Sequence, residues 1–183
     1  MQAASSSCPY HNHRKEGNQM TLNIAGIEEE SFVDGDGCRL TVFVQGCPHH
    51  CQGCHNPETH DFHAGKTIDT EEILKMLLSN PLLSGITFSG GEPFCQPEPL
   101  CSLAKKVHAK GLNIWCYSGY TLEELTQKNH PQTAALLQEI DVLVDGKYIE
   151  GQRDLTLRFR GSKNQRIIDM NATRSHGSVQ YLT

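Results

Sequence analysis

The chain has 183 residues and a formal net charge of −5, with 37% hydrophobic and 20% charged residues. This length suits one globular domain, and the acidic balance argues against nucleic acid as the main partner. No apolar run approaches the roughly 20 residues that span a bilayer, and the polar N-terminus lacks the apolar region of a secretory signal. We therefore expect a cytoplasmic protein that binds neither nucleic acid nor membrane.

The first 19 residues are rich in Ser, His and Asn and contain almost no apolar side chains. This composition predicts a disordered N-terminal extension, followed by a single domain over residues 20–183. Cys8, His11 and His13 raise the possibility of a metal-binding tail. Short His/Cys tracts are a weak signal, however, so a floppy leader is the simpler interpretation.

The domain alternates strand-like and helix-like segments. Extended segments are predicted at residues 20–27, 40–44, 85–89, 112–117, 142–144 and 167–168. Helices are predicted at residues 68–79, 99–110, 122–128 and 131–140, with a polar loop at 57–66. The first helix is expected to bury Ile73, Leu74, Leu77 and Leu78. This alternation predicts an α/β fold with a mostly parallel sheet and crossover helices.

Three of the eight cysteines follow the strand at 40–44 with the spacing C-x3-C-x2-C. They are Cys47, Cys51 and Cys54. In a chain without an export signal, such a group more often binds metal than forms disulfides. A fourth ligand from His49, His50 or His55 would give a zinc site, whereas an open fourth position suits a [4Fe–4S] cluster. The compact spacing favours the cluster without excluding zinc.

Four predicted strands end in polar or Gly-rich turns, at residues 46–56, 89–93, 118–119 and 145–146. The carboxyl ends of parallel strands meet at one edge of a sheet, where α/β folds build their sites. In the second turn, Gly90 and Gly91 allow close backbone approach to a ligand, and Glu92 offers an acceptor for an amino group. A lone Gly-Gly-Glu-Pro turn is a weak signal, so its position beside the cysteine loop carries the argument.

Together, the cysteine loop and the Gly-Gly-Glu-Pro turn resemble the radical S-adenosylmethionine (SAM) superfamily. The resemblance implies an incomplete TIM-like β/α barrel with a lateral opening. It also implies one [4Fe–4S] cluster held by the three cysteines, with SAM at the open iron. The turn Gly90-Gly91-Glu92 would then lie near the methionine moiety of SAM.

Further segments resemble the activating proteins of anaerobic ribonucleoside-triphosphate reductase, over about residues 20–170. They are residues 33–37, 43–47, 115–120, 144–147 and 159–165. This resemblance implies that the backbone of Gly53, Cys54 and His55 lies beside the adenosine of SAM. Ser118 and Asp145 are weaker candidates for the far wall of that pocket.

The implied reaction is reductive cleavage of SAM to methionine and a 5′-deoxyadenosyl radical, which generates a glycyl radical on the large chain of the reductase. A low-potential donor such as flavodoxin would supply the electron. No catalytic side chain is assigned, because the cluster and SAM carry the chemistry. The segment Tyr117-Ser118-Gly119-Tyr120 is similar to a glycyl-radical sequence, but it follows a mid-chain strand and is interpreted as a pocket turn.

Two other functions stay open at this point. One is a radical SAM enzyme that acts on a small molecule, for example a ring-forming enzyme of deazapurine biosynthesis. The other is a zinc-stabilised interaction module without catalysis. A basic C-terminal segment either docks a protein partner or is a solvated face. Its cations are Arg153, Arg158, Arg160, Lys163 and Arg166.

Overall fold

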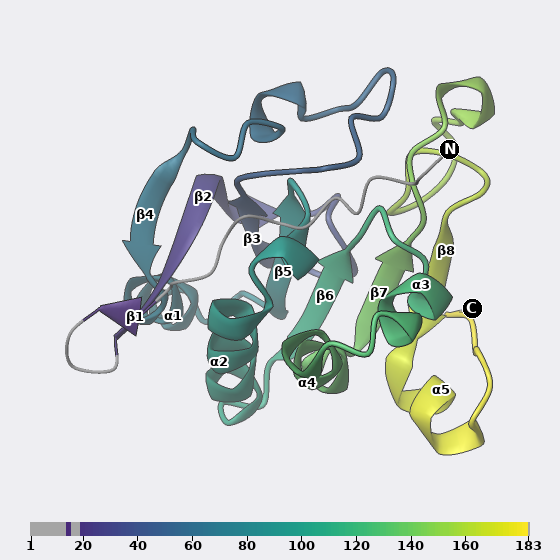
Figure 1. Cartoon of the computed structure of the whole chain (residues 1–183). Coiled ribbons are helices and arrows are strands. Elements are labelled where there is room, and N and C mark those ends of the chain that lie inside the picture. The colour runs from purple at the N-terminus through teal and green to yellow at the C-terminus, as the bar shows by residue number, and fades with distance from the viewer. Residues whose placement is uncertain (1–13, 16–18, 183) are drawn as a thin grey trace.

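The computed structural model describes residues 14–15 and 19–182, which form a mixed α/β fold (Figure 1). The strands are β1 (Arg14–Lys15), β2 (Gln19–Ser31), β3 (Arg39–Val44), β4 (Lys66–Asp69), β5 (Gly85–Gly90), β6 (Asn113–Tyr117), β7 (Val142–Asp145) and β8 (Arg166–Asp169). The α-helices are α1 (Thr70–Ser79), α2 (Pro97–His108), α3 (Leu122–Gln127), α4 (Pro131–Glu139) and α5 (Met170–His176). Short 3-10 helices are η1 (Pro57–Thr59), η2 (Pro93–Cys95) and η3 (Glu150–Gln152).

All the strands join one sheet in the order β1-β2-β3-β5-β6-β7-β8, with β4 paired to β2. The four central strands β3, β5, β6 and β7 are parallel to one another. On the flanks, β2 pairs antiparallel with β3 and β4, and β8 pairs antiparallel with β7. The predicted parallel sheet is therefore confirmed for its central strands. The flanking strands are antiparallel; the connection from β2 to β3, for example, is too short for the crossover that parallel strands require.

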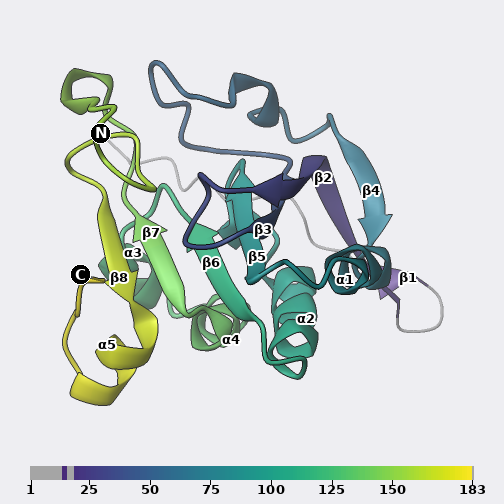
Figure 2. The ribbon, with the colours of Figure 1, turned by 180° about the vertical axis from the view of Figure 1, so that it is seen from behind.

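Side chains alternate across the central strands, as a sheet with two buried faces requires. On β3, Leu40, Val42 and Val44 belong to the main hydrophobic core, whereas Arg39 and Thr41 are buried on the opposite face. The main core includes buried residues of α1, α2, α3 and α4. Figure 1 shows α2, α3 and α4 on one side of the sheet, and Figure 2 shows the strands β5, β6 and β7 from behind. The opposite face is thus polar near β3 and β5.

Besides β1, strand β4 and helix α5 were not anticipated from the sequence. Strand β4 spans the end of the predicted polar loop and the first residues of the predicted helix, and its residues are exposed or half-buried, so antiparallel pairing with β2 rather than a hydrophobic pattern specifies it. Helix α5 begins at the N-cap Asp169, whose side chain accepts a hydrogen bond from the amide of Ala172 (2.8 Å), and ends at Gly177 (φ 70°). Asp169 and Gly177 are common helix-capping residues, but α5 has few apolar side chains, so the sequence shows no helical hydrophobic pattern there.

The predicted apolar face of the first helix is only partly correct. Ile73 and Leu77 are buried in the main core and Leu74 packs against it, but Leu78 is 45% exposed. The core stripe of α1 is therefore narrower than the sequence pattern indicated. Asp69 caps the helix as predicted, because its carboxylate accepts a hydrogen bond from the amide of Glu71 (2.9 Å).

The predicted N-terminal extension falls largely outside the described residues, and so do Cys8, His11 and His13. Its described part, Arg14–Lys15, forms β1 and pairs with the start of β2. Across residues 14–15 and 19–182, every helix is too short or too polar to cross a bilayer.

Arg39 is the largest side chain that is fully buried, and it crosses the polar face of the sheet. Its Nε donates to Thr87 Oγ1 (2.7 Å), and its Nη2 donates to the carbonyls of Ile86 (2.7 Å) and Asn113 (3.2 Å). The guanidinium also lies 5.6 Å from the ring centre of Trp115. Burial lowers the pKa of Arg39 to about 10, because the cation has lost its water. The fork of donors thus ties β3, β5 and β6 together.

We predict that Arg39→Lys lowers the free energy of unfolding by about 2–4 kcal/mol, because an ammonium cannot reach the acceptors on both β5 and β6 that the guanidinium serves. Arg153→Lys, at an exposed site, is the matched control and should change stability by less than about 0.5 kcal/mol. Urea denaturation followed by circular dichroism measures both. Equal stabilities of the two variants would contradict the role given to Arg39.

Candidate functional site

Two long excursions of the chain leave and re-enter the sheet at the same edge. One runs from the end of β3 to the start of β4, and the other runs from the end of β7 to the start of β8 (Figure 1). Val44 pairs with both Gly90 and Ile24, Ile24 pairs with Lys66, and Asp145 pairs with Arg166, so these strand ends are level with one another. The predicted convergence of strand-end turns on one edge is therefore confirmed.

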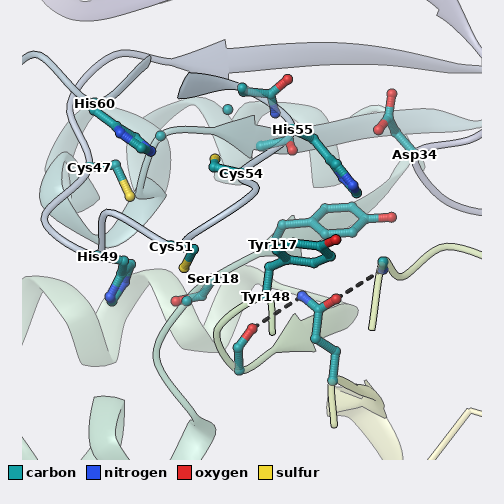
Figure 3. A pocket seen from close by; sticks show the side chains of 18 residues that line it. Asp34, Cys47, His49, Cys51, Cys54, His55, His60, Tyr117, Ser118 and Tyr148 are labelled. Carbon is teal, nitrogen blue, oxygen red and sulfur yellow. Dashed lines mark hydrogen bonds between the residues drawn. The ribbon is translucent and has the colours of Figure 1, made fainter. Parts of the chain in front are cut away.

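The first excursion begins with the cysteine loop. Gly46 (φ 92°) turns the chain out of β3, and Gly53 (φ 70°) allows the tight turn in which the amide of Cys54 donates to the carbonyl of Cys51 (3.2 Å). Cys47 is 8% exposed, and Cys51 and Cys54 are half-buried. All three line a cavity of about 280 Å³, shown in Figure 3. The structure thus brings the three predicted ligands to one site.

The donor set suits a cationic iron–sulfur cluster. Burial raises the pKa of Cys47 to about 12, and it also raises the pKa of Cys51, because a desolvated thiolate is costly. A thiolate in such surroundings needs positive charge beside it, which the iron ions of a cluster supply. Across residues 14–15 and 19–182, no three His, Cys, Asp or Glu side chains converge closely enough to hold one metal ion. Three thiols at one cavity are nevertheless the type of donor that an iron–sulfur cluster uses.

A strap formed by η1 and the residues after it holds the start of the cysteine loop. The amide of Gly46 donates to the carbonyl of Thr59 (2.8 Å), and the amide of Cys47 donates to the carbonyl of His60 (3.3 Å). The side-chain Nε2 of the buried Gln45 donates to the carbonyls of Glu58 (3.0 Å) and Asp61 (2.7 Å). The strap is therefore fixed on both sides of His60.

His60 also lines the cavity. From the sequence it was expected in a polar loop, at the surface or behind the residues that contact the ligand. Its Nε2 is buried and has no hydrogen-bond partner among the described residues. Its ring packs edge-on against His50, with ring centres 4.9 Å apart. Burial lowers the pKa of His60, with a smaller effect from His50, so the neutral imidazole is favoured.

The Gly-Gly turn lies directly against the cysteine loop. The amide of Gly91 donates to the carbonyl of Val44 (2.8 Å), and the amide of Glu92 donates to the carbonyl of Gly46 (2.9 Å). A Cβ on Gly91 would lie 2.4 Å from the oxygen of Gly46, and one on Gly90 would lie 2.6 Å from Cα of Phe43. Both glycines line the cavity, so the turn forms its floor.

Glu92 is fully buried but does not line the cavity. Its carboxylate accepts hydrogen bonds from Ser118 Oγ (3.0 and 3.1 Å) and from the amides of Gly119 (2.9 Å) and Phe94 (3.0 Å). His49 Nε2 lies 2.8 Å from the same carboxylate, and the His49 side chain is 5% exposed. Glu92 therefore connects the cysteine loop to the turn after β6, and its expected contact with an amino group of SAM stays a prediction.

The opposite wall of the cavity is aromatic. Tyr117 donates a hydrogen bond from its hydroxyl to the carbonyl of Phe159 (2.9 Å), and burial raises its pKa. Tyr148 packs against His55 with ring centres 4.8 Å apart (Figure 3). Both tyrosines line the cavity. Tyr117 belongs to the segment that was interpreted as a pocket turn, whereas Tyr148 was not predicted as a site residue. Ser118 and Gly119 also line the cavity, so the interpretation of the segment 117–120 as a pocket turn is confirmed.

Gln165 closes the second excursion. Its Oε1 accepts hydrogen bonds from the amides of Gly161 (2.9 Å) and Ser162 (3.1 Å), and its Nε2 donates to the carbonyl of Gly146 (3.1 Å). Two of these bonds are drawn in Figure 3. Asp145 points elsewhere: it is buried, accepts hydrogen bonds from Arg166 and from the amide of Leu122 (2.7 Å), and does not line the cavity. Its proposed place on the far wall is not where the structure puts it.

Several predicted site residues share the cavity, and others lie just outside it. Those that line it are Cys47, Cys51, Cys54, His55, Gly90, Gly91 and Ser118. Gly53 does not line it, and a Cβ at this position would lie 2.9 Å from Oε1 of Glu150. Gly53 therefore serves the turn and its packing on the second excursion.

A wider groove of about 460 Å³ adjoins the cavity. The two share Asp34, His55, Tyr117 and Gly161. Three exposed apolar side chains line the groove, with exposed fractions of 69%, 75% and 83%. They are Phe32, Val33 and Leu155. The groove leads from the surface to the aromatic wall of the cavity.

The predicted basic segment does not act as one surface. Arg166 forms ion pairs with Asp145 and Glu123, and the Lys163 ammonium lies 3.4 Å from Asp154. Arg153, Arg158 and Arg160 line the groove, and the side chain of Arg158 is 79% exposed. Only part of the segment is therefore available to a partner at the groove.

Comparison with known proteins agrees with this geometry. Residues 33–168 match the family described as a 4Fe-4S single cluster domain. The anaerobic ribonucleoside-triphosphate reductase-activating protein of Haemophilus influenzae is 38% identical, over 79% of this chain and 96% of the relative. Those of Enterobacteria phage T4 and Escherichia coli K12 are each 36% identical, over 80% and 73% of this chain and 93% and 90% of the relatives.

These matches cover the cysteine loop, the Gly-Gly turn and both excursions, and they extend over nearly the whole length of the relatives. The chain belongs to the family of anaerobic ribonucleoside-triphosphate reductase-activating proteins, which carries a 4Fe-4S single cluster domain.

Proposed function

We propose that the protein cleaves SAM reductively at a [4Fe–4S] cluster and generates the glycyl radical of anaerobic ribonucleoside-triphosphate reductase. The observation that carries the proposal is the single cavity lined by three thiols, a Gly-Gly floor and an aromatic wall. Its volume of about 280 Å³ is close to the lower end of the range for small-molecule sites, roughly 300 Å³. A cluster and a small ligand bound side by side would explain why residues after β3, β5, β6 and β7 all line the cavity.

In this proposal, Cys47, Cys51 and Cys54 would hold the cluster, and SAM would bind to it through its amino and carboxylate groups. When bound, the reduced cluster supplies one electron to the sulfonium, which gives methionine and the 5′-deoxyadenosyl radical. The protein's own work is to bind, orient and exclude other hydrogen donors. No general base is needed, so none of the histidines is assigned as one.

The two ends of SAM would meet different walls. Gly90 and Gly91 present backbone at the floor, where a methionine moiety can approach closely. His55 and the two tyrosines offer flat rings for the adenine, together with the backbone at Cys54. Gly53 would act by shaping the turn that presents Cys54. Glu92 supports this arrangement indirectly by holding the cysteine loop and the turn after β6 in register.

The adjoining groove is proposed as the entry for the glycine-bearing segment of the reductase. It opens onto the aromatic wall, and its exposed apolar rim suits a protein segment better than a small polar metabolite. This feature favours the activating function over a small-molecule radical SAM enzyme. We further propose that the sheet, with its α1–α4 layer on one face and a buried polar face on the other, is an incomplete barrel that leaves this opening. A cytoplasmic location and a flavodoxin-like electron donor stay predictions.

Cys51→Ala should abolish both cluster binding and activation. Anaerobically reconstituted wild-type protein should absorb near about 400 nm through thiolate–iron charge transfer, and it should give a glycyl-radical EPR signal with SAM, a reductant and the reductase. The variant should lose both signals. Cys38→Ala, outside the cavity, is the control and should keep them. A colourless wild-type protein containing one zinc ion would sink the proposal.

Gly91→Ala should weaken SAM binding at least about tenfold, because the added methyl group collides with the carbonyl of Gly46 and pushes the floor away from the cysteine loop. Gly26→Ala, where a Cβ meets nothing within 4 Å, provides the control. Equilibrium dialysis of SAM against the reconstituted proteins measures the difference. Unchanged affinity in the Gly91 variant would remove the floor from the SAM site.

Leu155→Asp should raise the KM for the reductase roughly tenfold, the size of one lost interface contact, and leave SAM cleavage with a chemical reductant unchanged. Leu82→Asp places the same charge at a site that is 76% exposed and lies outside both cavities. Equal effects of the two substitutions, or a parallel loss of SAM cleavage, would show that the groove does not receive the reductase.

A further inference from the structure

His60 is half-buried, but its Nε2 atom is fully buried and lacks a hydrogen-bond partner among the described residues. The residue lies at the wall of the cavity that the three cysteines line. Buried polar atoms nearly always have a hydrogen-bond partner, because removing them from water without one costs free energy. The missing partner is therefore to be sought in what the cavity binds.

The backbone of His60 is held by hydrogen bonds, and its ring packs against His50. The carbonyl of His60 accepts the amide of Cys47, and its amide donates to the carbonyl of Pro57 (3.2 Å). The side chain of Gln45 fixes the neighbouring carbonyls of Glu58 and Asp61. Edge-on packing against His50 restrains the ring from the outside. These contacts keep the imidazole at the cysteine end of the cavity, where Figure 3 shows it beside Cys47.

The chemistry at this end of the cavity is that of sulfur. None of the cysteine sulfurs is a hydrogen-bond partner of Nε2 in the described structure. A partner must therefore occupy the space between the ring and the thiols. A cluster held by Cys47, Cys51 and Cys54 places sulfides in this space, and sulfides accept hydrogen bonds from ring N–H groups.

We propose that Nε2–H of His60 donates a hydrogen bond to a sulfur of the [4Fe–4S] cluster and thereby raises its reduction potential. This inference rests on the proposed ligation of the cluster by the three cysteines. Reduction adds negative charge to the cluster, so a donor to sulfur stabilises the reduced form more than the oxidised form. His60 is thus a positioning residue that helps the cluster accept its electron, and it touches no substrate.

The test compares the midpoint potentials of anaerobically reconstituted proteins by EPR-monitored redox titration without SAM. His60→Leu should lower the equilibrium constant for reduction roughly tenfold, about 59 mV for one electron. His60→Gln, which retains an N–H donor of similar reach, should recover most of that change. His63→Leu, in the same loop but exposed and outside the cavity, should match the wild type. Equal potentials for His60→Leu and wild type would overturn the inference.

A second measurement does not depend on the variants assembling a cluster. In wild-type protein labelled with ¹⁵N-histidine, pulsed EPR of the reduced cluster should detect a weak nitrogen coupling and one exchangeable proton. Absence of the nitrogen coupling, or a strong coupling typical of a nitrogen bound directly to iron, would overturn the hydrogen bond. Failure of the wild type to bind any cluster is a separate outcome, seen first in the absorbance, and it would overturn the proposed function as well.

Discussion

The site depends on one buried carboxylate. Glu92 has no exposed surface, and a charge in that position is tolerated only because several donors surround it. These donors come from three parts of the chain: His49 in the cysteine loop, Phe94 in η2, and Ser118 with Gly119 after β6. The same contacts that repay the desolvation of Glu92 therefore set the distance between the cysteine loop and the opposite wall of the cavity.

Two glutamines do similar work for the long excursions, whose backbone groups lack a sheet partner. The side chain of Gln45 donates hydrogen bonds to carbonyls on both sides of His60. The side chain of Gln165 accepts hydrogen bonds from two backbone amides of the second excursion and donates one to a carbonyl there. A side-chain amide can donate and accept at once, so one residue satisfies several backbone groups. In this way irregular chain becomes rigid enough to hold cysteines on one side and aromatic rings on the other. Nε2 of His60 is one of four buried side-chain atoms without a partner among the described residues, and His60 is the only one of these four residues that lines the cavity.

Much of the fold was predictable, because the central strands carry strong local signals. Residues 40–44 and 85–89 are mostly apolar or β-branched, and a glycine follows each within two residues. Thr121 caps α3 as part of a capping box, which is a local signal. Strand β4 was not predictable in the same way, since its polar residues are specified by backbone pairing to β2. For the site, the three cysteines and the Gly-Gly turn were found by spacing and position. Tyr148, Gln165 and His60 were missed because their roles depend on contacts made across the cavity.

By itself, the sequence determined which chemistry is available: thiols at a spacing suited to a cluster, glycines at a strand end, and a family resemblance that the comparisons bear out. Spacing along one loop is a local property, so it is readable without a structure. Only the tertiary structure decided that the carboxylates of Glu92 and Asp145 accept hydrogen bonds from groups of this same chain and do not line the cavity. Only it showed that His60 faces the cavity and that a groove adjoins it. Those outcomes depend on which side chains the folded sheet edge brings together, and no local pattern encodes them.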